Sequence, residues 1–152
     1  IIMNFDGFVD KYEGDAIIAF WNAPLQQVDH ARRSVRAAMR CQAKLAEMRP
    51  SIRERIGRDL RMRIGLNSGP AVVGNLGSHT RFDYTMLGDA VNLASRLEGI
   101  NKQFGTYTIL SEATLEGMEG AFPVRELSRV AVVGRKDPVR IYEPRSGTGC
   151  GS

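Results

Sequence analysis

The chain has 152 residues, which is the length of a single domain. With 43% apolar residues, 25% charged residues and a mean hydropathy of −0.23, its composition is that of a globular protein and excludes a disordered one. The longest apolar run, residues 16–21, is far shorter than the roughly 20 residues that span a bilayer, and no signal peptide opens the chain. Cys41 and Cys150 lack metal-ligand spacing and predict a reducing location. We therefore expect the chain in the cytoplasm, either by itself or as the cytoplasmic part of a membrane-anchored protein.

The charge balance is basic, with a formal net charge of +4 and an isoelectric point near 9.4. A basic chain raises nucleic-acid binding as an alternative function. However, five basic residues share one face of a predicted helix without aromatic residues between them for base stacking: Arg32, Arg33, Arg36, Arg40 and Lys44. The pattern therefore indicates a solvated helix face and no nucleic-acid partner, while the positive field favours an anionic substrate.

Two apolar runs near the start of the chain predict a β-hairpin. Residues 7–12 and 15–21 are rich in β-forming residues, and Glu13 and Gly14 form the expected turn. A helix follows, because apolar residues recur at steps of three and four: Val28, Ala31, Val35, Ala38, Cys41, Leu45 and Met48. Pro50 is expected to break or kink this helix, with a further helical turn over residues 51–57.

The second half of the chain predicts shorter elements. Strands are expected over residues 61–67, over 71–74 as the partner of 61–67, and over 81–87, 106–110, 122–133 and 139–142. Gly88 and Asp89 open a helix that Gly105 closes, and Ser111 caps a short helix that reaches Met118. Because these elements interleave without a strict βαβ repeat, we expect an α+β domain with one mixed or antiparallel sheet over residues 1–144. Residues 145–152 are expected to be a frayed tail or a remnant.

Several polar side chains have the chemistry of a ligand site. Asp15 follows a glycine turn, where a carboxylate can bind a hard cation such as Mg²⁺, and Lys11 is a potential hydrogen-bond donor in an apolar run. Asn92 and Arg96 share one helix face and could align a sugar and neutralise a phosphoryl oxygen. Taken singly, each has a structural interpretation: a turn aspartate, an edge lysine and an exposed polar pair.

Two longer motifs together resemble a known family. Residues 10–21, Asp-Lys-Tyr-Glu-Gly-Asp-Ala-Ile-Ile-Ala-Phe-Trp, look like the central hairpin of class III adenylyl/guanylyl cyclase catalytic domains. Residues 73–78 followed by 83–98 resemble the second signature of that family, and the resemblance continues through residues 133–135 to Tyr142. Two long motifs in the right order are specific. They imply the ferredoxin-like, palm-type α+β fold, with a mixed, mainly antiparallel sheet flanked by helices.

Carried over by position, the resemblance implies a metal and purine site. Asp15 matches the second metal-binding aspartate, which implies Mg²⁺ or Mn²⁺, with two ions in the complete domain. Lys11 matches the lysine at the adenine edge, and Thr85 matches its purine-specifying partner in many bacterial adenylyl cyclases. A lysine donates to the unprotonated N1 of adenine, whereas N1 of guanine carries a proton. The pair therefore implies ATP as the substrate.

The resemblance also implies the residues that act on the ribose and the phosphates. Asn92 matches the ribose-orienting asparagine, and Arg96 matches the arginine that stabilises the transition state. For the phosphate-binding residue, Arg135 is the best positional match and Lys136 the next. The implied reaction is attack of the ATP 3′-oxygen on its own α-phosphorus, giving 3′,5′-cyclic AMP and pyrophosphate in a signalling role.

The family's catalytic domains pair around a two-fold axis, and their sites lie at the interface. The metal ligands come from one protomer, and the purine, ribose and transition-state residues come from the other. The resemblance therefore implies a homodimer in which Lys11 and Asp15 serve different sites and a monomer is inactive. Regulatory domains of a parent chain are further expected partners.

One part of the family pattern is missing. The family's first strand carries the other metal-binding aspartate, and residues 4–8 around Asp6 do not fit it. Because the chain also opens on Ile1, we expect a fragment that lacks the first strand and helices and does not itself make cyclic AMP at a meaningful rate. The alternative is a non-catalytic regulatory or dimerisation module that binds nucleotide, which the intact motif residues disfavour. A diguanylate cyclase is disfavoured because its Gly-Gly-Glu/Asp-Glu-Phe turn is absent.

Overall fold

The structure, a computed structural model, describes residues 1–75, 84–132 and 134–145. Its elements follow in this order: a 3-10 turn η1 (Met3–Phe5), β1 (Phe8–Glu13), β2 (Ala16–Phe20), α1 (His30–Ile56), β3 (Ile64–Leu66), β4 (Val72–Asn75), β5 (Tyr84–Leu87), α2 (Asp89–Phe104), β6 (Thr108–Ser111), α3 (Glu112–Met118), β7 (Val124–Val130) and β8 (Val139–Pro144). The α+β class is confirmed. Among the described helices, none is long and apolar enough to cross a membrane.

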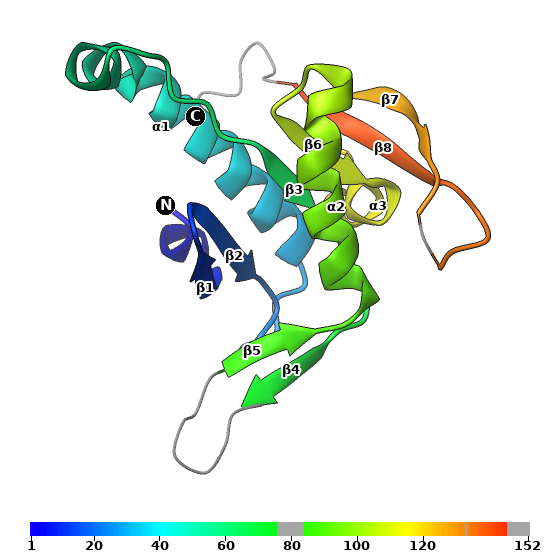
Figure 1. Cartoon of the computed structure of the whole chain (residues 1–152). Coiled ribbons are helices and arrows are strands. Elements are labelled where there is room, and N and C mark those ends of the chain that lie inside the picture. Colours follow the sequence, from blue (N-terminus) through cyan, green and yellow to red (C-terminus); the bar gives the residue numbers. More distant parts are fainter. Residues whose placement is uncertain (76–83, 133, 146–152) are drawn as a thin grey trace.

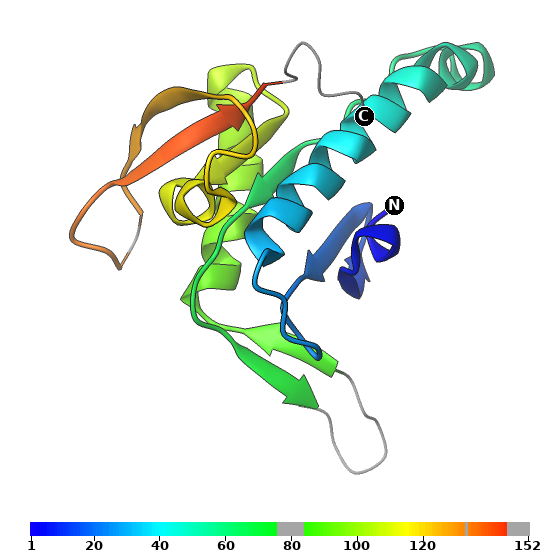
Figure 2. The same cartoon turned by 180° about the vertical axis from the view of Figure 1, so that it is seen from behind.

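The strands of the described residues form three sheets, so the expectation of one sheet was wrong. A four-stranded sheet has the order β3-β6-β8-β7, in which only the β3–β6 pair is parallel, while β1-β2 and β4-β5 are separate antiparallel pairs. The hairpin β1-β2 lies on one side of the molecule and β7-β8 on the other, with α1, β3 and α2 between them (Figures 1 and 2). The predominance of antiparallel pairs agrees with the prediction.

The partner of β3 is also different from the prediction. Residues 71–74 were expected to pair with 61–67, but β4 pairs with β5 and β3 pairs with β6. The reason lies at the end of β3, where Asn67 Nδ2 donates to the carbonyl of Ala90 at 2.9 Å and the Ser68 and Thr114 hydroxyls are 2.9 Å apart. These bonds tie the chain to α2 and α3. The chain therefore runs on into the β4-β5 ribbon, which extends away from the core (Figure 1).

Helix α1 is continuous over 27 residues, with Pro50 inside it, so the proline does not break the helix. The helix ends at Gly57, whose φ of +77° is the left-handed conformation that favours glycine. The predicted apolar stripe is buried in the first half of the helix, at Ala31, Val35 and Ala38. Val28 was wrongly included, because it precedes the helix and is fully exposed.

The core forms where α2 packs on the four-stranded sheet. Leu93, Leu97 and Ile100 of α2 are buried against Ile109 of β6 and Ile141 of β8. Beneath them, the buried Asn101 amide donates to the Ile64 carbonyl at 3.0 Å and accepts from the Thr106 hydroxyl at 2.8 Å. A buried amide with these partners is satisfied on both its donor and acceptor sides. Helix α2 is thus fixed in rotation and height against the sheet.

The predicted helix ends are confirmed on both sides of β6. Gly105 ends α2 with a φ of +64°, and the Ser111 side chain accepts a hydrogen bond from the Thr114 amide at the start of α3. At the end of β8, the Arg145 amide donates to the Pro123 carbonyl at 2.8 Å. The rest of the predicted tail, residues 146–152, lies outside the described residues, as do residues 81–83 of a predicted strand.

Candidate functional site

Three of the sequence-predicted site residues surround one hollow of about 330 Å³. Asn92, Arg96 and Arg135 line it together with four neighbours: Asp89, Leu93, Val132 and Gly134. Lys136, the alternative to Arg135, is not among the lining residues. The hollow therefore joins the first turns of α2 to the segment between β7 and β8, which are about 40 residues apart in sequence.

The local fold explains why these side chains converge. Leu93 and Leu97 are 3% and 0% exposed, so their burial turns the face with Asn92 and Arg96 outward. Val132 packs on the cluster that contains Leu93 and brings the β7–β8 segment to that face. There the Arg135 amide donates to the Val132 carbonyl at 3.1 Å, and Gly134 has a φ of +87°.

The hollow is suited to an anion that carries sugar hydroxyls. It holds two guanidinium groups against the single carboxylate of Asp89, and it opens at the N-terminal end of α2, where the helix dipole is positive. The side chains of Asn92, Arg96 and Arg135 form no hydrogen bond or ion pair with the residues that the structure describes. Their polar groups are therefore available to a ligand.

Lys11 and Thr85 do not line the hollow; they lie on β1 and on β5, and β5 leads directly into α2. The Thr85 hydroxyl donates to the carboxylate of Asp10 at 2.7 Å, a contact between residues 75 positions apart. Lys11 is exposed and directly follows Asp10 on β1. The predicted purine-specifying residues thus lie on two strands that this hydrogen bond joins.

Asp15 lies elsewhere, in the turn of the β1-β2 hairpin. Glu13 pairs with Ala16, so Gly14 and Asp15 form a two-residue turn, and Asp15 does not begin the strand as predicted. Gly14 has a φ of +60° at the first turn position, which is where a type II′ turn requires glycine. The hairpin and α2 lie on either side of the first half of α1 (Figures 1 and 2).

The carboxylate of Asp15 fits part of a divalent-cation site. It is exposed and has no hydrogen bond or ion pair with any described residue. Mg²⁺ takes one or two carboxylates and completes its shell with water and substrate phosphates, so one free carboxylate on a turn is a suitable donor. No cluster of three or more metal-binding side chains occurs in the described part of the chain.

Asp6, which the sequence did not support as a metal ligand, is engaged in structural contacts. Its carboxylate pairs with Arg33, which also bonds Asp29 at 2.7 Å. This hydrogen bond from Arg33 lowers the pKa of Asp29. Asp6 therefore helps to hold the first residues against α1.

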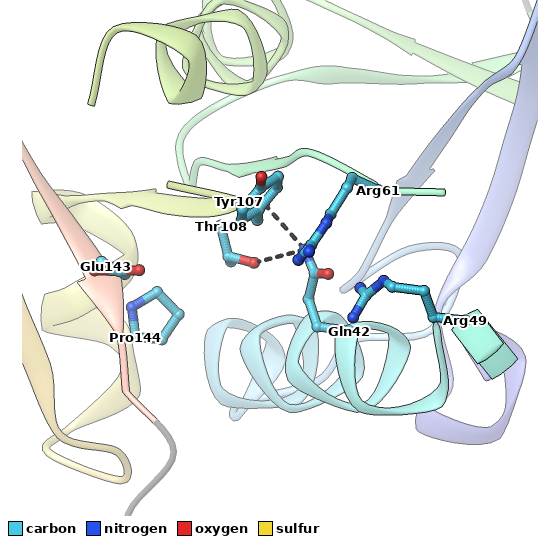
Figure 3. Close-up of a pocket in the computed structure, with 7 residues that line it drawn as sticks. All are labelled: Gln42, Arg49, Arg61, Tyr107, Thr108, Glu143 and Pro144. Carbon is cyan, nitrogen blue, oxygen red and sulfur yellow. Dashed lines mark hydrogen bonds between the residues drawn. The ribbon is translucent and has the colours of Figure 1, made fainter. Parts of the chain in front are cut away.

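A second hollow of about 270 Å³ contains none of the predicted site residues. It lies between α1 and the ends of β6 and β8, and Figure 3 shows its lining: Gln42, Arg49, Arg61, Tyr107, Thr108, Glu143 and Pro144. The Gln42 amide donates to the Tyr107 carbonyl at 3.0 Å and to the Thr108 hydroxyl at 3.1 Å, and the Arg61 guanidinium lies 5.4 Å from the centre of the Tyr107 ring. These contacts join α1 to β6, so the polar groups here serve packing.

A comparison with known protein families covers every residue of the candidate site. The sequence profile of the adenylate and guanylate cyclase catalytic domain matches residues 2–143. This chain belongs to that family. Adenylate cyclase 1 of Rhizobium meliloti is 35% identical over 143 residues, which are 94% of this chain and 22% of that protein. The chain thus spans about a fifth of the length of this curated relative.

Solved structures of adenylyl and guanylyl cyclases have the same fold. The adenylyl cyclase CyaB from P. aeruginosa superposes with a TM-score of 0.84 at 28% identity, over 97% of this chain and 76% of that one. The guanylyl cyclase Cya2 superposes with a TM-score of 0.81 at 30% identity, over 99% and 75%. The palm-type fold is therefore confirmed, and the similar proteins include cyclases of both nucleotides.

Two residues at the site were not found by sequence reasoning. Asp89 was interpreted only as a helix-start residue, although it lines the hollow. Asp10 lay within the hairpin motif without a role of its own, although it binds Thr85. The Asp89 position, three residues before Asn92, was a usable signal because one helix turn separates them. The contact of Asp10 with a strand 75 residues away left no signal in the spacing.

Proposed function

We propose that this domain converts ATP to 3′,5′-cyclic AMP and pyrophosphate at a site completed by a second copy of the chain. The observation that carries the proposal is the split of the predicted residues. Asn92, Arg96 and Arg135 converge on one hollow, whereas Asp15 is exposed on the turn of the β1-β2 hairpin, which α1 separates from α2 (Figure 1). A reaction that needs both sets has to bring two surfaces together.

At the hollow, each residue has a distinct task in this reaction. The O3′–Pα bond forms, the bond from Pα to the bridging oxygen of the β-phosphate breaks, and the proton of the 3′-hydroxyl passes to water as pyrophosphate leaves. Arg96 neutralises charge that builds up on the phosphoryl oxygens, and Arg135 holds the pyrophosphate portion. Asn92 hydrogen-bonds the ribose so that the 3′-oxygen stays in line with phosphorus.

The choice of ATP rests on Lys11 and Thr85. The similar proteins include both adenylyl and guanylyl cyclases, so similarity alone favours neither purine. The exposed ammonium of Lys11 donates to the unprotonated N1 of adenine and meets a proton on N1 of guanine. A site that hydrogen-bonds its substrate in this way rejects the wrong pattern strongly.

Asp15 is the residue that would hold a divalent cation, Mg²⁺ or Mn²⁺, together with phosphate oxygens of the nucleotide. When bound, two such ions would stabilise the attacking and leaving oxygens. Because Asp15 stands on a turn and forms no hydrogen bond or ion pair with the described residues, its carboxylate is free to face the hollow of a partner copy. A two-fold dimer would then form two equal sites.

Mixing two inactive variants tests the shared site. Asp15→Asn and Arg96→Ala, made in the natural protein that carries residues 1–152, should each abolish cyclic AMP formation from ATP and Mn²⁺. An equimolar mixture should regain about a quarter of the wild-type rate, because half of the dimers pair unlike chains and each of these has one intact site. The readout is cyclic AMP formed per minute.

The control is a mixture of Asn92→Ala with Arg96→Ala. Both residues line the same hollow, so no dimer of these two variants has an intact site, and the mixture should stay inactive. Recovery in this control, or none with Asp15→Asn, would show that the site is not divided as proposed. A wild-type protein that binds ATP without forming cyclic AMP would instead favour a non-catalytic nucleotide-binding module.

A further inference from the structure

The contact between Asp10 and Thr85 gives the Thr85 hydroxyl a fixed direction. An ionised carboxylate can only accept hydrogen bonds, so at 2.7 Å the Thr85 hydroxyl has to be the donor. A free threonine hydroxyl rotates and can act as donor or acceptor toward a ligand. Once its hydrogen points at Asp10, only its lone pairs remain for another partner.

The backbone of β1 is shaped for this contact. Val9 pairs with Ala19 and Lys11 pairs with Ile18, so Asp10 is the extra residue of a β-bulge. Bulges interrupt the strict alternation of side chains and redirect them, often next to active sites. Here the bulge residue is half-buried and its carboxylate reaches β5, while the next residue is the exposed Lys11.

We infer that Asp10 is a positioning residue that makes Thr85 a hydrogen-bond acceptor and so selects purines with an amino group at position 6. This rests on the proposed function. An acceptor matches the 6-amino group of adenine and opposes the 6-carbonyl oxygen of guanine or hypoxanthine. Threonine alone would tolerate both groups by rotating its hydroxyl. Asp10 removes that tolerance, so it determines specificity without touching the nucleotide.

The hydrogen bond also has a simpler possible use, which is to join β1 to β5. A purely structural bond would affect the stability of both nucleotide complexes alike. A bond that orients the hydroxyl affects the preference between a 6-amino and a 6-oxo purine. ATP and ITP differ at position 6 and in the N1 proton that accompanies the 6-carbonyl, and neither has the 2-amino group of GTP. Their ratio therefore separates the two uses.

The test compares nucleotides that bind but cannot react. Dissociation constants are measured for 3′-deoxy-ATP and 3′-deoxy-ITP, which lack the attacking hydroxyl, with wild-type protein and Asp10→Asn. The amide of asparagine has nearly the same shape but can donate to Thr85, which frees the hydroxyl hydrogen to face the purine. The preference for the 6-amino nucleotide should fall about tenfold or more, since a charge-assisted hydrogen bond no longer fixes the hydroxyl.

Two further variants keep the result interpretable. Glu13→Gln removes the same charge from the same strand and should leave the preference at its wild-type value, because Glu13 has no bond to Thr85. Thr85→Val removes the hydroxyl and should lower the preference even with Asp10 intact, and adding Asp10→Asn should then change it no further. If Asp10→Asn does not fold, Asp10→Ala, which leaves the Thr85 hydroxyl free to rotate, should lower the preference in the same way and decides the matter.

An unchanged preference in Asp10→Asn or in Thr85→Val would overturn the inference. Failure of the proposed function has a different signature: wild-type protein that binds 3′-deoxy-ATP but forms no cyclic AMP from ATP, or that binds neither nucleotide. If the protein binds 3′-deoxy-ATP without forming cyclic AMP, the preference between the two nucleotides can still be measured. If it binds neither nucleotide, both proposals are overturned together.

Discussion

The start of α2 and the β1-β2 hairpin carry two parts of one proposed site, and they differ in how the rest of the chain supports them. Asn92 and Arg96 lie next to the buried Leu93 and Leu97 on α2, and this helix packs on the four-stranded sheet. The hairpin is a separate two-stranded sheet that the Asp10–Thr85 bond joins to β5, and its residues around the turn, 11–17, are exposed.

Under the proposed function, this difference suits the two regions to different parts of the reaction. A phosphoryl group in transition needs donors held closely in place, and α2 provides a rigid base for Asn92 and Arg96. A cation at Asp15 is held mainly by several oxygens at once, so a single exposed carboxylate on a turn can be sufficient from this side. The rigid region thus fits the transition state, and the exposed one fits a docking partner.

The largest effect is expected at Arg96. Arg96→Ala should lower kcat by about 10³-fold or more, the range for arginines that neutralise charge in phosphoryl transfer. The thermal midpoint should stay unchanged, because the exposed side chain has no partner among the described residues. Cyclic AMP formation and the melting temperature together check this.

Lys102→Ala is the matched control, since Lys102 is an exposed cation on the same helix outside the hollow. It should leave kcat within about twofold of wild type, as expected for a surface charge away from the site. A comparable loss from both variants would mean that the rate depends on the general positive field of α2 rather than on Arg96 itself.

The comparison between the regions can be tested through stability. Leu97→Ala should lower the free energy of unfolding by about 2–5 kcal/mol, because the side chain is fully buried between α2 and the sheet. Ile17→Ala on the hairpin should cost well under half of that, because Ile17 is 52% exposed. Urea denaturation of both variants measures the difference.

Equal losses from the two substitutions would contradict the contrast. They would mean that the hairpin's exposed apolar face is covered in solution, as it would be in a dimer. Repeating the Ile17→Ala measurement over a range of protein concentrations separates these cases, because only a dimer contact makes the loss depend on concentration.

The helix α2 and the face that Asn92 and Arg96 share on it could be predicted from the sequence because their signals are local. Leu93 and Leu97 repeat at helical spacing, so the face with Asn92 and Arg96 followed directly. Strand pairing could not be predicted in the same way. The pairing of β3 depends on the contacts of Asn67 and Ser68 with α2 and α3, which lie more than 20 residues away. Long-range hydrogen bonds leave no periodic trace.

The convergence of Arg135 on the hollow was implied by family position alone, and its cause is a packing contact. Val130, Val132 and Val139 bring the segment to α2, because all three pack on the cluster around Leu93. At Pro50 the sequence left a break or a kink open, and the structure has no break, with the expected helical residues after Pro50 joined to the rest of α1. Half of that helix is held by buried contacts at Ala31 and Val35, and its second half continues from them.

The smallest expected effect concerns Cys41 on α1, the helix between the two regions. Burial raises the pKa of the Cys41 thiol, since the thiolate is the charged form that desolvation disfavours. In a Cys150→Ser background, iodoacetamide should therefore modify the folded chain more slowly than the urea-unfolded chain at pH 8, because alkylation requires the thiolate. The folded rate should rise with pH through a midpoint above that of the unfolded chain.

The same shift means that the free energy of unfolding falls slightly as pH rises past the unfolded thiol's pKa, since the folded state binds this proton more tightly. Equal rates for the folded and unfolded chains would contradict this prediction. They would mean that the Cys41 thiol is as accessible in the folded chain as in the unfolded one, and so that α1 separates from the sheet near Cys41.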